Sequence, residues 1–221
     1  MSEPDGFTQM IDSAERFFAE LAQNNTRDWF EPRKDHYVEE IRKPATFLAD
    51  IMAEELSRQS GQALKPKLFR IYRDVRFSKD KTPYNAHLHM IWTEADGDPL
   101  APAYFFGVAP GKMDLGFGVI RMEGAGLTRY RAFVDAWGDL LCDRMSEAGL
   151  SLSDWGPDPL KRVPKPYPAD HPHGDLLKRK SLIFHVPPPL DWRSHPGGLV
   201  SALRGAFGTV EPLAELLRSR L

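Results

Sequence analysis

Hydrophobic positions along the first 60 residues recur at helical spacing. Residues 8–23 carry an apolar stripe that predicts an amphipathic helix. The pattern breaks at Asn25, and Thr26 is a residue type that caps a new helix, expected over residues 26–41. A third helix is expected from Pro44 to just before Gly61. The side chains expected to point inward from the first and third helices are Ile11, Ala14, Phe17, Phe18, Leu21, Phe47, Leu48, Ile51, Met52 and Leu56.

Beyond Pro66 the helical spacing gives way to alternation. Alternating apolar residues predict a strand over residues 69–77 with one buried face. Arg73 falls on that buried face, where a lone charge would be prohibitive, so it should pair with a buried acid or with carbonyl groups. The apolar residues on the buried face are Phe69, Ile71, Val75 and Phe77, and those on the opposite face are Arg70, Tyr72, Asp74 and Arg76.

A hairpin is predicted in the middle of the chain. Residues 86–93 alternate and predict a further strand. The sequence Ala109-Pro110-Gly111-Lys112 then has Pro and Gly where a type II turn requires them. Gly116 and Gly118, in the strand after this turn, indicate a bulge or a close approach by another backbone or a ligand.

The second half of the chain adds helices and one more strand. The predicted elements are a helix over 127–148, a Pro-rich coil over 156–174, a short helix over 174–180, a strand over 181–186 and a helix over 196–218. Helices at both ends with antiparallel strands between them favour an α+β fold. No linker or repeat interrupts the sequence, so we expect a single domain over residues 1–221.

Composition places the chain among ordinary globular proteins, with 42% hydrophobic and 27% charged residues. No apolar run approaches the length of a membrane span, and the acidic first residues do not resemble a signal peptide. Cys142 is the only cysteine, so an internal disulfide is excluded. We therefore expect a cytoplasmic location, and the sequence leaves the oligomeric state open.

Positive charge is concentrated, although the net charge of the whole chain is −2. Residues 65–81 contain seven Lys and Arg against two Asp, and residues 161–180 contain six against two. The remainder of the chain is strongly acidic as a consequence. Localised positive charge of this kind is typical of a binding site rather than of a uniformly basic surface.

The basic stretch from Arg70 to Tyr84 is the first candidate site. Arginine stays protonated and presents a planar fork of donors that suits carboxylate or phosphate. We interpret the stretch as a pocket for a small anion such as a phosphate, a nucleotide or a carboxylate. A structural network of ion pairs is the alternative for the same residues. The candidate ligand-binding residues are Arg70, Arg73, Arg76, Lys79, Lys81, Tyr84 and, from the second basic stretch, Lys165.

The same stretch resembles a known family signature. Its pattern is Arg70-x-x-Arg73-Asp74-x-Arg76-Phe77-x-x-Asp80-Lys81-x-x-Tyr84. The pattern is similar to that of a family of bacterial proteins of comparable length, catalogued as domain of unknown function 2461. The resemblance extends to an early group, Asn25, Trp29, Phe30, Arg33 and Tyr37, and to a later one, Pro164, Lys165, Tyr167, Asp170, His171 and Pro172. It implies no activity, cofactor or catalytic residue.

Catalysis, if there is any, would fall to Asp74 and His171. A histidine changes charge near neutral pH, and the adjacent Asp170 could fix its tautomer. Tyr84 would supply a hydroxyl donor at the edge of the pocket. Two points count against this reading: cations around Asp74 favour its charged form, and no nucleophile is evident. The stretch around Lys165 could equally be a surface connector.

Other classes of function find less support. Two-residue spacing in His87-x-His89 and in His171-x-His173 suits a metal, but a catalytic zinc needs three ligands, so we expect no metal site. No dinucleotide or P-loop motif is present, and the cofactor stays unknown. Aromatic residues do alternate with the cations, as in strands that stack bases. Because the core requires Phe69 and Phe77 on the predicted pattern, nucleic-acid binding is the weaker alternative.

Overall fold

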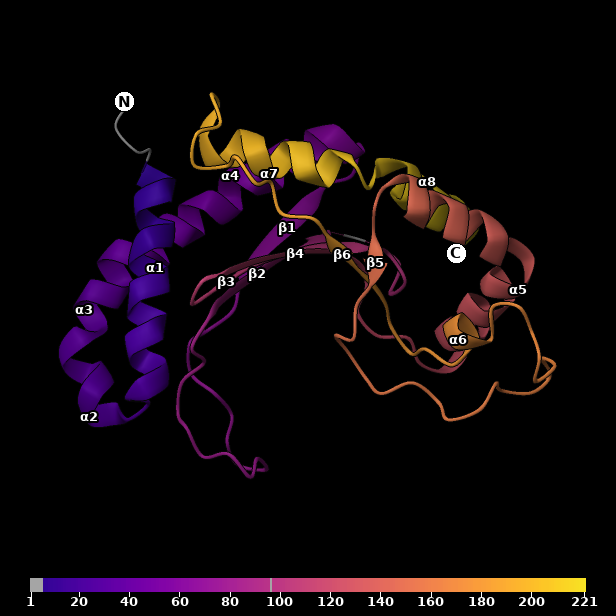
Figure 1. Ribbon diagram of the computed structural model, residues 1–221, viewed down its shortest axis with the longest axis horizontal. Coiled ribbons are helices and arrows are strands. Elements are labelled where there is room, and N and C mark those ends of the chain that lie inside the picture. The colour runs from indigo at the N-terminus through magenta and orange to yellow at the C-terminus, as the bar shows by residue number, and fades with distance from the viewer. Residues whose placement is uncertain (1–5, 96) are drawn as a thin grey trace. The chain divides into compact units, whose positions relative to one another are not determined.

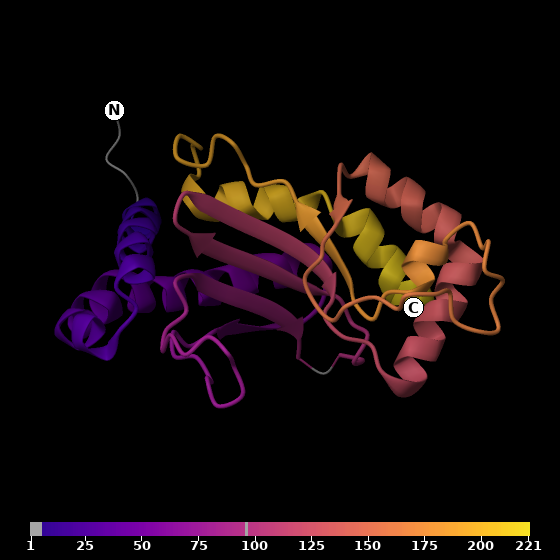
Figure 2. The ribbon, with the colours of Figure 1, turned by 60° about the horizontal axis from the view of Figure 1, so that its bottom comes forward.

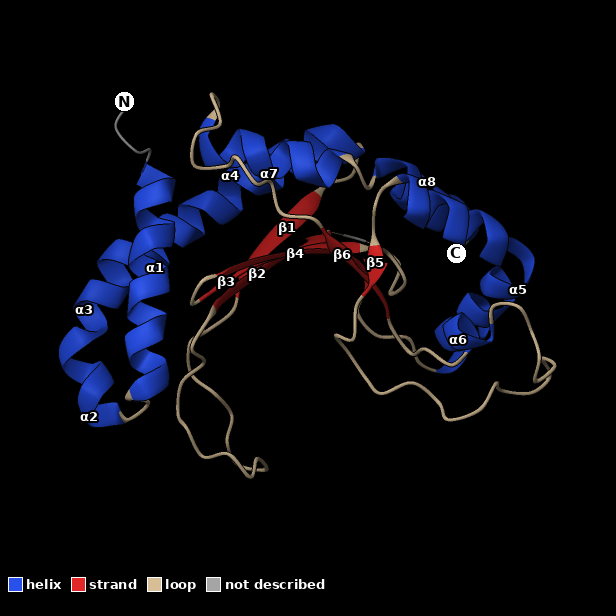
Figure 3. Cartoon of the chain, viewed as in Figure 1, coloured by secondary structure: helices blue, strands red, loops and turns tan. Residues whose placement is uncertain are grey.

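The computed structural model of the protein describes residues 6–95 and 97–221 and has the predicted α+β architecture (Figure 1). The strands, drawn in red in Figure 3, form a sheet in the order β1-β2-β3-β4-β6-β5. The helices are α1 (Gly6–Gln23), α2 (Arg27–Phe30), η1 (Glu31–Arg33), α3 (Lys34–Tyr37), η2 (Val38–Arg42), α4 (Lys43–Ser60), α5 (Gly124–Glu147), α6 (Gly174–Leu177), α7 (Gly198–Gly208) and α8 (Glu211–Arg220). The strands are β1 (Leu64–Leu68), β2 (Leu88–Glu94), β3 (Ala103–Ala109), β4 (Lys112–Val119), β5 (Ser151–Leu152) and β6 (Leu182–Val186).

Contacts between backbone positions divide the chain into two compact units. The first unit comprises residues 1–92, 105–114 and 188–205, and the second comprises residues 93–104, 115–187 and 206–221. The boundary falls inside β2, β3, β4 and α7. Among the described residues, no helix is both long enough and apolar enough to cross a membrane.

The helices of the first unit bury the predicted apolar stripes, with two differences from the expectation. The Thr26 side chain caps α2 by accepting the Trp29 N–H, and Gly61 ends α4 at φ 70. No break separates the second helix from the third, because a π-helical turn, η2, leads directly into α4. Phe47 was expected in the core and is 61% exposed, so that assignment is wrong. Its ring lies 5.9 Å from that of Phe7.

The predicted strand over residues 69–77 is wrong, because the strand β1 lies earlier and ends at Leu68. Beyond the bond from the Phe69 N–H to the His89 carbonyl, the chain leaves the sheet. Phe69 is 44% exposed and Phe77 is 95% exposed, so neither belongs to the core. The segment is rich in Asp, Thr and Arg side chains that hydrogen-bond locally, and such bonds compete with a strand ladder.

Trp92 fixes the sheet to the helices in the first unit. Its side chain is fully buried and donates a hydrogen bond from Nε1 to the Ala49 carbonyl of α4, at 2.8 Å. The apolar side chains buried with it from α1, α4 and β3 include Ile11, Phe18, Leu21, Leu48, Met52, Leu56 and Phe106.

The β3–β4 hairpin confirms the predicted turn, with Gly111 at φ 65. In the second unit, β4 pairs antiparallel with β6, and Gly118 lies opposite Ile183. Gly118 has φ 136, and a Cβ at this position would lie 2.0 Å from the Leu182 carbonyl oxygen. The close approach expected at this glycine is therefore made by the neighbouring strand.

Helices α6 and α8 contact α5 in the second unit (Figure 2). The Tyr130 hydroxyl of α5 donates to the Leu176 carbonyl of α6 at 2.9 Å. The single C-terminal helix expected over residues 196–218 is wrong, because α7 and α8 are separate. Pro212 lies in the first turn of α8, where a missing N–H is tolerated, whereas a continuous helix would place it in the interior.

We predict that Gly118→Ala destabilises the protein by about 3 kcal/mol or more, because it adds both a clash with β6 and left-handed backbone strain. Gly205→Ala is the matched control: it lies in α7 with open space around its Cβ and should stabilise by about 0.5–1 kcal/mol. Urea unfolding of both variants tests this. Equal stability of Gly118→Ala and wild type would contradict the β4–β6 register.

Candidate functional site

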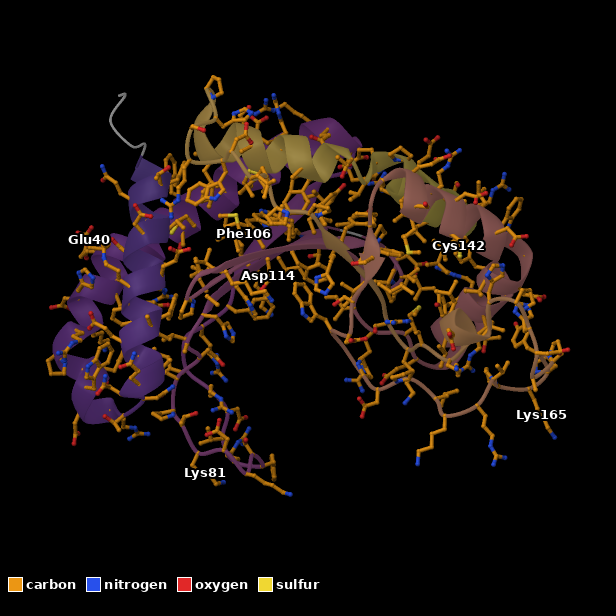
Figure 4. The ribbon with its side chains drawn as sticks, in the orientation of Figure 1. Glu40, Lys81, Phe106, Asp114, Cys142 and Lys165 are labelled. Atoms are coloured by element: carbon orange, nitrogen blue, oxygen red, sulfur yellow. The ribbon has the colours of Figure 1, made fainter. Side chains whose placement is uncertain are left out.

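The basic loop, residues 69–87 between β1 and β2, carries most of the predicted site residues. It extends away from the strands of the first unit, and Lys81 lies toward its far end (Figure 4). The loop has an outgoing arm that follows β1 and a returning arm that leads to β2. The two arms meet where Tyr72 and Tyr84 form an isolated antiparallel bridge. The Arg73 N–H donates to the Pro83 carbonyl at 2.9 Å, and the Asn85 N–H donates to the Ile71 carbonyl at 2.7 Å.

Arg73 connects the two arms of the basic loop. Its guanidinium lies 2.5 Å from the Asp80 carboxylate, donates to the Thr82 carbonyl at 3.2 Å and contacts the Thr82 hydroxyl. The Thr82 N–H and then Arg73 lower the pKa of Asp80 to about 2. Arg73 does not project into the core: its side chain is 24% exposed, and its acidic partner is 59% exposed. These contacts give Arg73 a structural role.

Asp74 and Arg76 form a second pair on the outgoing arm. The Arg76 Nε donates to one Asp74 carboxylate oxygen at 2.9 Å, and Nη2 donates to the other at 2.7 Å. Hydrogen bonds from Arg76 lower the pKa of Asp74, and Arg70 lowers it further. Asp74 is thereby held as a carboxylate that orients Arg76, which makes it a weak proton acceptor.

The signature residues from distant parts of the chain meet at the base of the basic loop. The Asn25 side chain donates to the Tyr84 carbonyl at 2.9 Å and accepts the Tyr84 N–H at 3.1 Å. The Tyr84 ring stacks on Phe30, with centroids 4.2 Å apart, and is 2% exposed. Tyr84 is therefore a buried anchor, contrary to the expected position at a pocket edge.

Arg70 lines a small cavity beside Phe30, which we call the Arg70 pocket. Its volume is about 150 Å³. The lining residues are Phe30, Lys34, Tyr37, Val38, Arg42, Arg70, Ile71 and Tyr72. Lys34, Val38 and Arg42 follow one another at four-residue spacing along α3 and η2, which places them on one face of the helical segment. Single π-helical turns such as η2 occur frequently at functional sites.

The charge of the Arg70 pocket is one-sided. Three of its lining residues are cations, Lys34, Arg42 and Arg70, and among the described residues no carboxylate lines it. Within the described part of the chain, no acidic side chain lies within ion-pair distance of these three. Burial raises the pKa of Tyr37 to about 12, with Arg42 acting in the opposite direction. The Tyr37 hydroxyl therefore stays protonated at neutral pH and can donate a hydrogen bond. Sequence reasoning missed Lys34 and Arg42, which lie on a helix that is distant in the sequence.

His87 and His89 stack on one another, with ring centroids 3.9 Å apart. The His89 ring lies where a Cβ on Gly107 would be, at 2.6 Å, so the glycine makes room for it. Although His89 is an exposed residue, partial desolvation of its ring and then His87 lower its pKa from 6.5 to about 4. Burial also lowers the pKa of His87. In the described residues, no group of three His, Cys, Asp or Glu side chains is arranged to hold a metal ion.

The histidines of the Pro-rich segment belong to the second unit and are tied to α5. The His171 Nε2 lies 3.1 Å from Asp135, and its Nδ1 accepts the His173 N–H at 3.0 Å. The carboxylate that orients His171 is thus Asp135 and not the expected Asp170. Lys165 is exposed on the same segment (Figure 4). Because Asp74 lies in the first unit and His171 in the second, their pairing stays a prediction.

Cys142 lies near a histidine but lacks the properties of a nucleophile. Its Sγ is 3.9 Å from His173 Nδ1, and the His173 Nε2 is 2.9 Å from Asp139. Burial raises the pKa of the thiol, and Asp139 and Asp143 raise it further. A thiol kept protonated by burial and acidic neighbours is unreactive. The arrangement therefore anchors His173 against α5, where Gly138 leaves space for its ring.

Comparison with known families identifies the chain. A family described as a conserved hypothetical protein family, DUF2461, matches residues 13–215. The match covers most of the chain, and the chain belongs to this family. A search of curated proteins finds no match.

We predict that Asn25→Ala destabilises the protein by about 1–3 kcal/mol, because it leaves both backbone groups of the part-buried Tyr84 without partners. Asn24→Ala, which removes one exposed hydrogen bond to the Glu20 carbonyl, is the matched control and should cost less than about 0.5 kcal/mol. Chemical denaturation of the two variants compares them. Similar values for both would show that Asn25 does not anchor the loop.

We also predict that His89 makes the protein sensitive to acid. In the unfolded chain its imidazole titrates near 6.5 and in the folded protein near 4, so the unfolded state binds more protons between these values. Stability is therefore lost as pH falls through this range. When the pH is lowered from about 7.5 to about 5, the melting temperature of His89→Gln should fall less than that of wild type. His36→Gln, a change at an exposed histidine of α3, is the control, and an unchanged pH response in His89→Gln would contradict the assignment.

Proposed function

We propose that this member of the DUF2461 family binds a small oxyanion, a phosphate or a carboxylate, in the Arg70 pocket. The observation that carries the proposal is the convergence of Lys34, Arg42 and Arg70 on one cavity that no carboxylate lines. Uncompensated cations around a cavity repel one another, and an anion between them relieves that repulsion.

The donors around the pocket suit such an anion in number and type. Arg42 and Arg70 each offer a planar fork of N–H groups, and Lys34 offers a compact ammonium. Tyr37 and Tyr72 add hydroxyl donors on the same cavity, and Tyr37 stays protonated at neutral pH. Each charge-assisted hydrogen bond contributes on the order of 1.5–3 kcal/mol.

The size of the pocket limits the ligand. A volume of about 150 Å³ equals the share of about five water molecules in the liquid. This accommodates a phosphate group or a short carboxylate but not an entire nucleotide. A larger ligand would place its anionic group in the pocket and its remainder outside, beside the exposed Tyr72 ring.

The structural alternative fits the other cations of the basic loop better. Arg73 and Arg76 are engaged by Asp80 and Asp74 within the loop itself. Lys81 donates to the Val75 carbonyl at 2.9 Å, and Lys79 and Lys165 do not line the Arg70 pocket. We therefore assign oxyanion binding in the pocket to Arg70 alone among the predicted cations, and we assign no catalytic step to Asp74 or His171.

We predict that the protein binds inorganic phosphate or sulfate, and that Arg42→Ala and Arg70→Ala each weaken binding by about tenfold or more, because each removes a charge-assisted contact. Isothermal titration calorimetry at low ionic strength measures the affinities. Arg16→Ala, at an arginine of α1 whose guanidinium donates to Ser13 and does not line the Arg70 pocket, is the matched control and should bind like wild type. Equal affinities in all four proteins, or no binding by wild type, would overturn the proposal.

A further inference from the structure

We propose that the outer surface of the basic loop binds single-stranded nucleic acid, with bases stacking on exposed aromatic rings and phosphates contacting loop cations. This goes beyond the oxyanion pocket, and it rests mainly on other residues, although Arg70 and Tyr72 belong to both sets. The aromatic residues are Phe69, Tyr72 and Phe77, and the cations are Lys67, which precedes the loop in β1, with Arg70, Lys79 and Lys81.

The aromatic rings are the first observation. Phe69 and Tyr72 are each 44% exposed, and Phe77 is 95% exposed. The core does not use Phe77, and yet the loop is held in a defined shape by the Arg73–Asp80 and Asp74–Arg76 pairs. The loop therefore presents a nearly complete phenyl surface to solvent, on which a base can stack.

Cations accompany two of these rings, Phe69 and Phe77. The Lys67 ammonium lies 5.1 Å from the centroid of Phe69, and the Arg76 guanidinium lies 5.8 Å from that of Phe77. Within the described residues, Lys67, Arg70, Lys79 and Lys81 have no carboxylate within ion-pair distance. Proteins that bind single-stranded nucleic acid without sequence preference combine unneutralised cations with aromatic rings on which the bases stack.

The spacing of the rings favours a single strand over a duplex. An extended chain advances about 3.3 Å per residue, so Phe69 and Tyr72 lie at most about 10 Å apart along it, and Tyr72 and Phe77 at most about 16 Å. Rings separated in this way can each receive a different base. Bases in a duplex are covered on both faces by their neighbours and cannot accept such stacking.

A membrane surface is the other partner that basic and aromatic residues could fit, and it fits less well. A loop that inserts into lipid gathers its apolar side chains at one end, with Lys and Arg behind them. Here Lys79, Asp80 and Lys81 lie beyond Phe77 in the sequence, and Lys81 lies toward the far end of the loop (Figure 4). The rings are distributed along the chain with arginines between them. This arrangement suits a single-stranded nucleic acid that runs along the loop.

Fluorescence anisotropy with a labelled mixed-sequence single-stranded oligonucleotide tests the proposal. We expect wild type to bind at low salt, with an affinity that falls with salt at a log–log slope of about −2, as for about three phosphate contacts. Phe77→Ala should weaken binding by about fivefold or more, the lower limit for loss of one base–aromatic stack. Because Phe77 is almost entirely exposed, this variant should keep the wild-type melting temperature.

Phe47→Ala is the matched control, since Phe47 is also exposed but lies on α4, outside the loop. It should bind the oligonucleotide like wild type. Equal weakening in both variants, no binding by wild type, tighter binding to a duplex of the same sequence, or binding to phosphatidylserine vesicles alone would each overturn the proposal. Phosphate binding in Phe77→Ala should equal that of wild type, so failure of this proposal and failure of the oxyanion pocket can be told apart.

Discussion

The candidate site depends on one constraint, the pair of hydrogen bonds between the Asn25 side chain and the backbone of Tyr84. The basic loop leaves the sheet after β1 and has only a short bridge between its arms. A segment with so few ladder bonds has little to hold it against the mutual repulsion of its cations. Asn25 satisfies both backbone groups of Tyr84, and Phe30 stacks on its ring, so the returning arm is attached to the helices of the first unit. This attachment also places Arg70 and Tyr72 opposite the helical face that carries Lys34 and Arg42.

Ion pairs inside the loop act on its shape more than on its stability. Exposed pairs of this kind contribute about 0–1 kcal/mol each, because water screens them. Asp80 and Asp74 nevertheless decide which cations are available to a ligand, because they engage Arg73 and Arg76. Among the described residues, Arg70, Lys79 and Lys81 have no carboxylate within ion-pair distance. The two acids of the basic loop therefore sort its five Lys and Arg residues into those that build the loop and those that can meet an anion.

The sequence predicted the helices, the hairpin and the close approach at Gly118, because each rests on a local pattern or a local backbone requirement. It failed at the basic loop for a physical reason. Alternation of apolar and polar residues predicts a strand only if a neighbouring strand is available, and here local side-chain bonds replace the ladder. The exposure of Phe77 and the roles of Lys34 and Arg42 depend on which distant segments meet. No spacing within one segment could reveal them.

The overlap between the Arg70 pocket and the loop surface has a thermodynamic consequence. Arg70 and Tyr72 line the pocket and also belong to the set of residues that would contact a single strand. Two ligands that use the same guanidinium cannot act independently, and any coupling between them must be equal in both directions. A phosphate of the strand that enters the pocket would compete with free phosphate, whereas a strand that contacts only the outer cations would be opposed by the added negative charge of a filled pocket. In both cases the bound oxyanion weakens attachment of the strand. The sign of the coupling thus follows from the position of Arg70, at the point where the pocket and the loop surface meet.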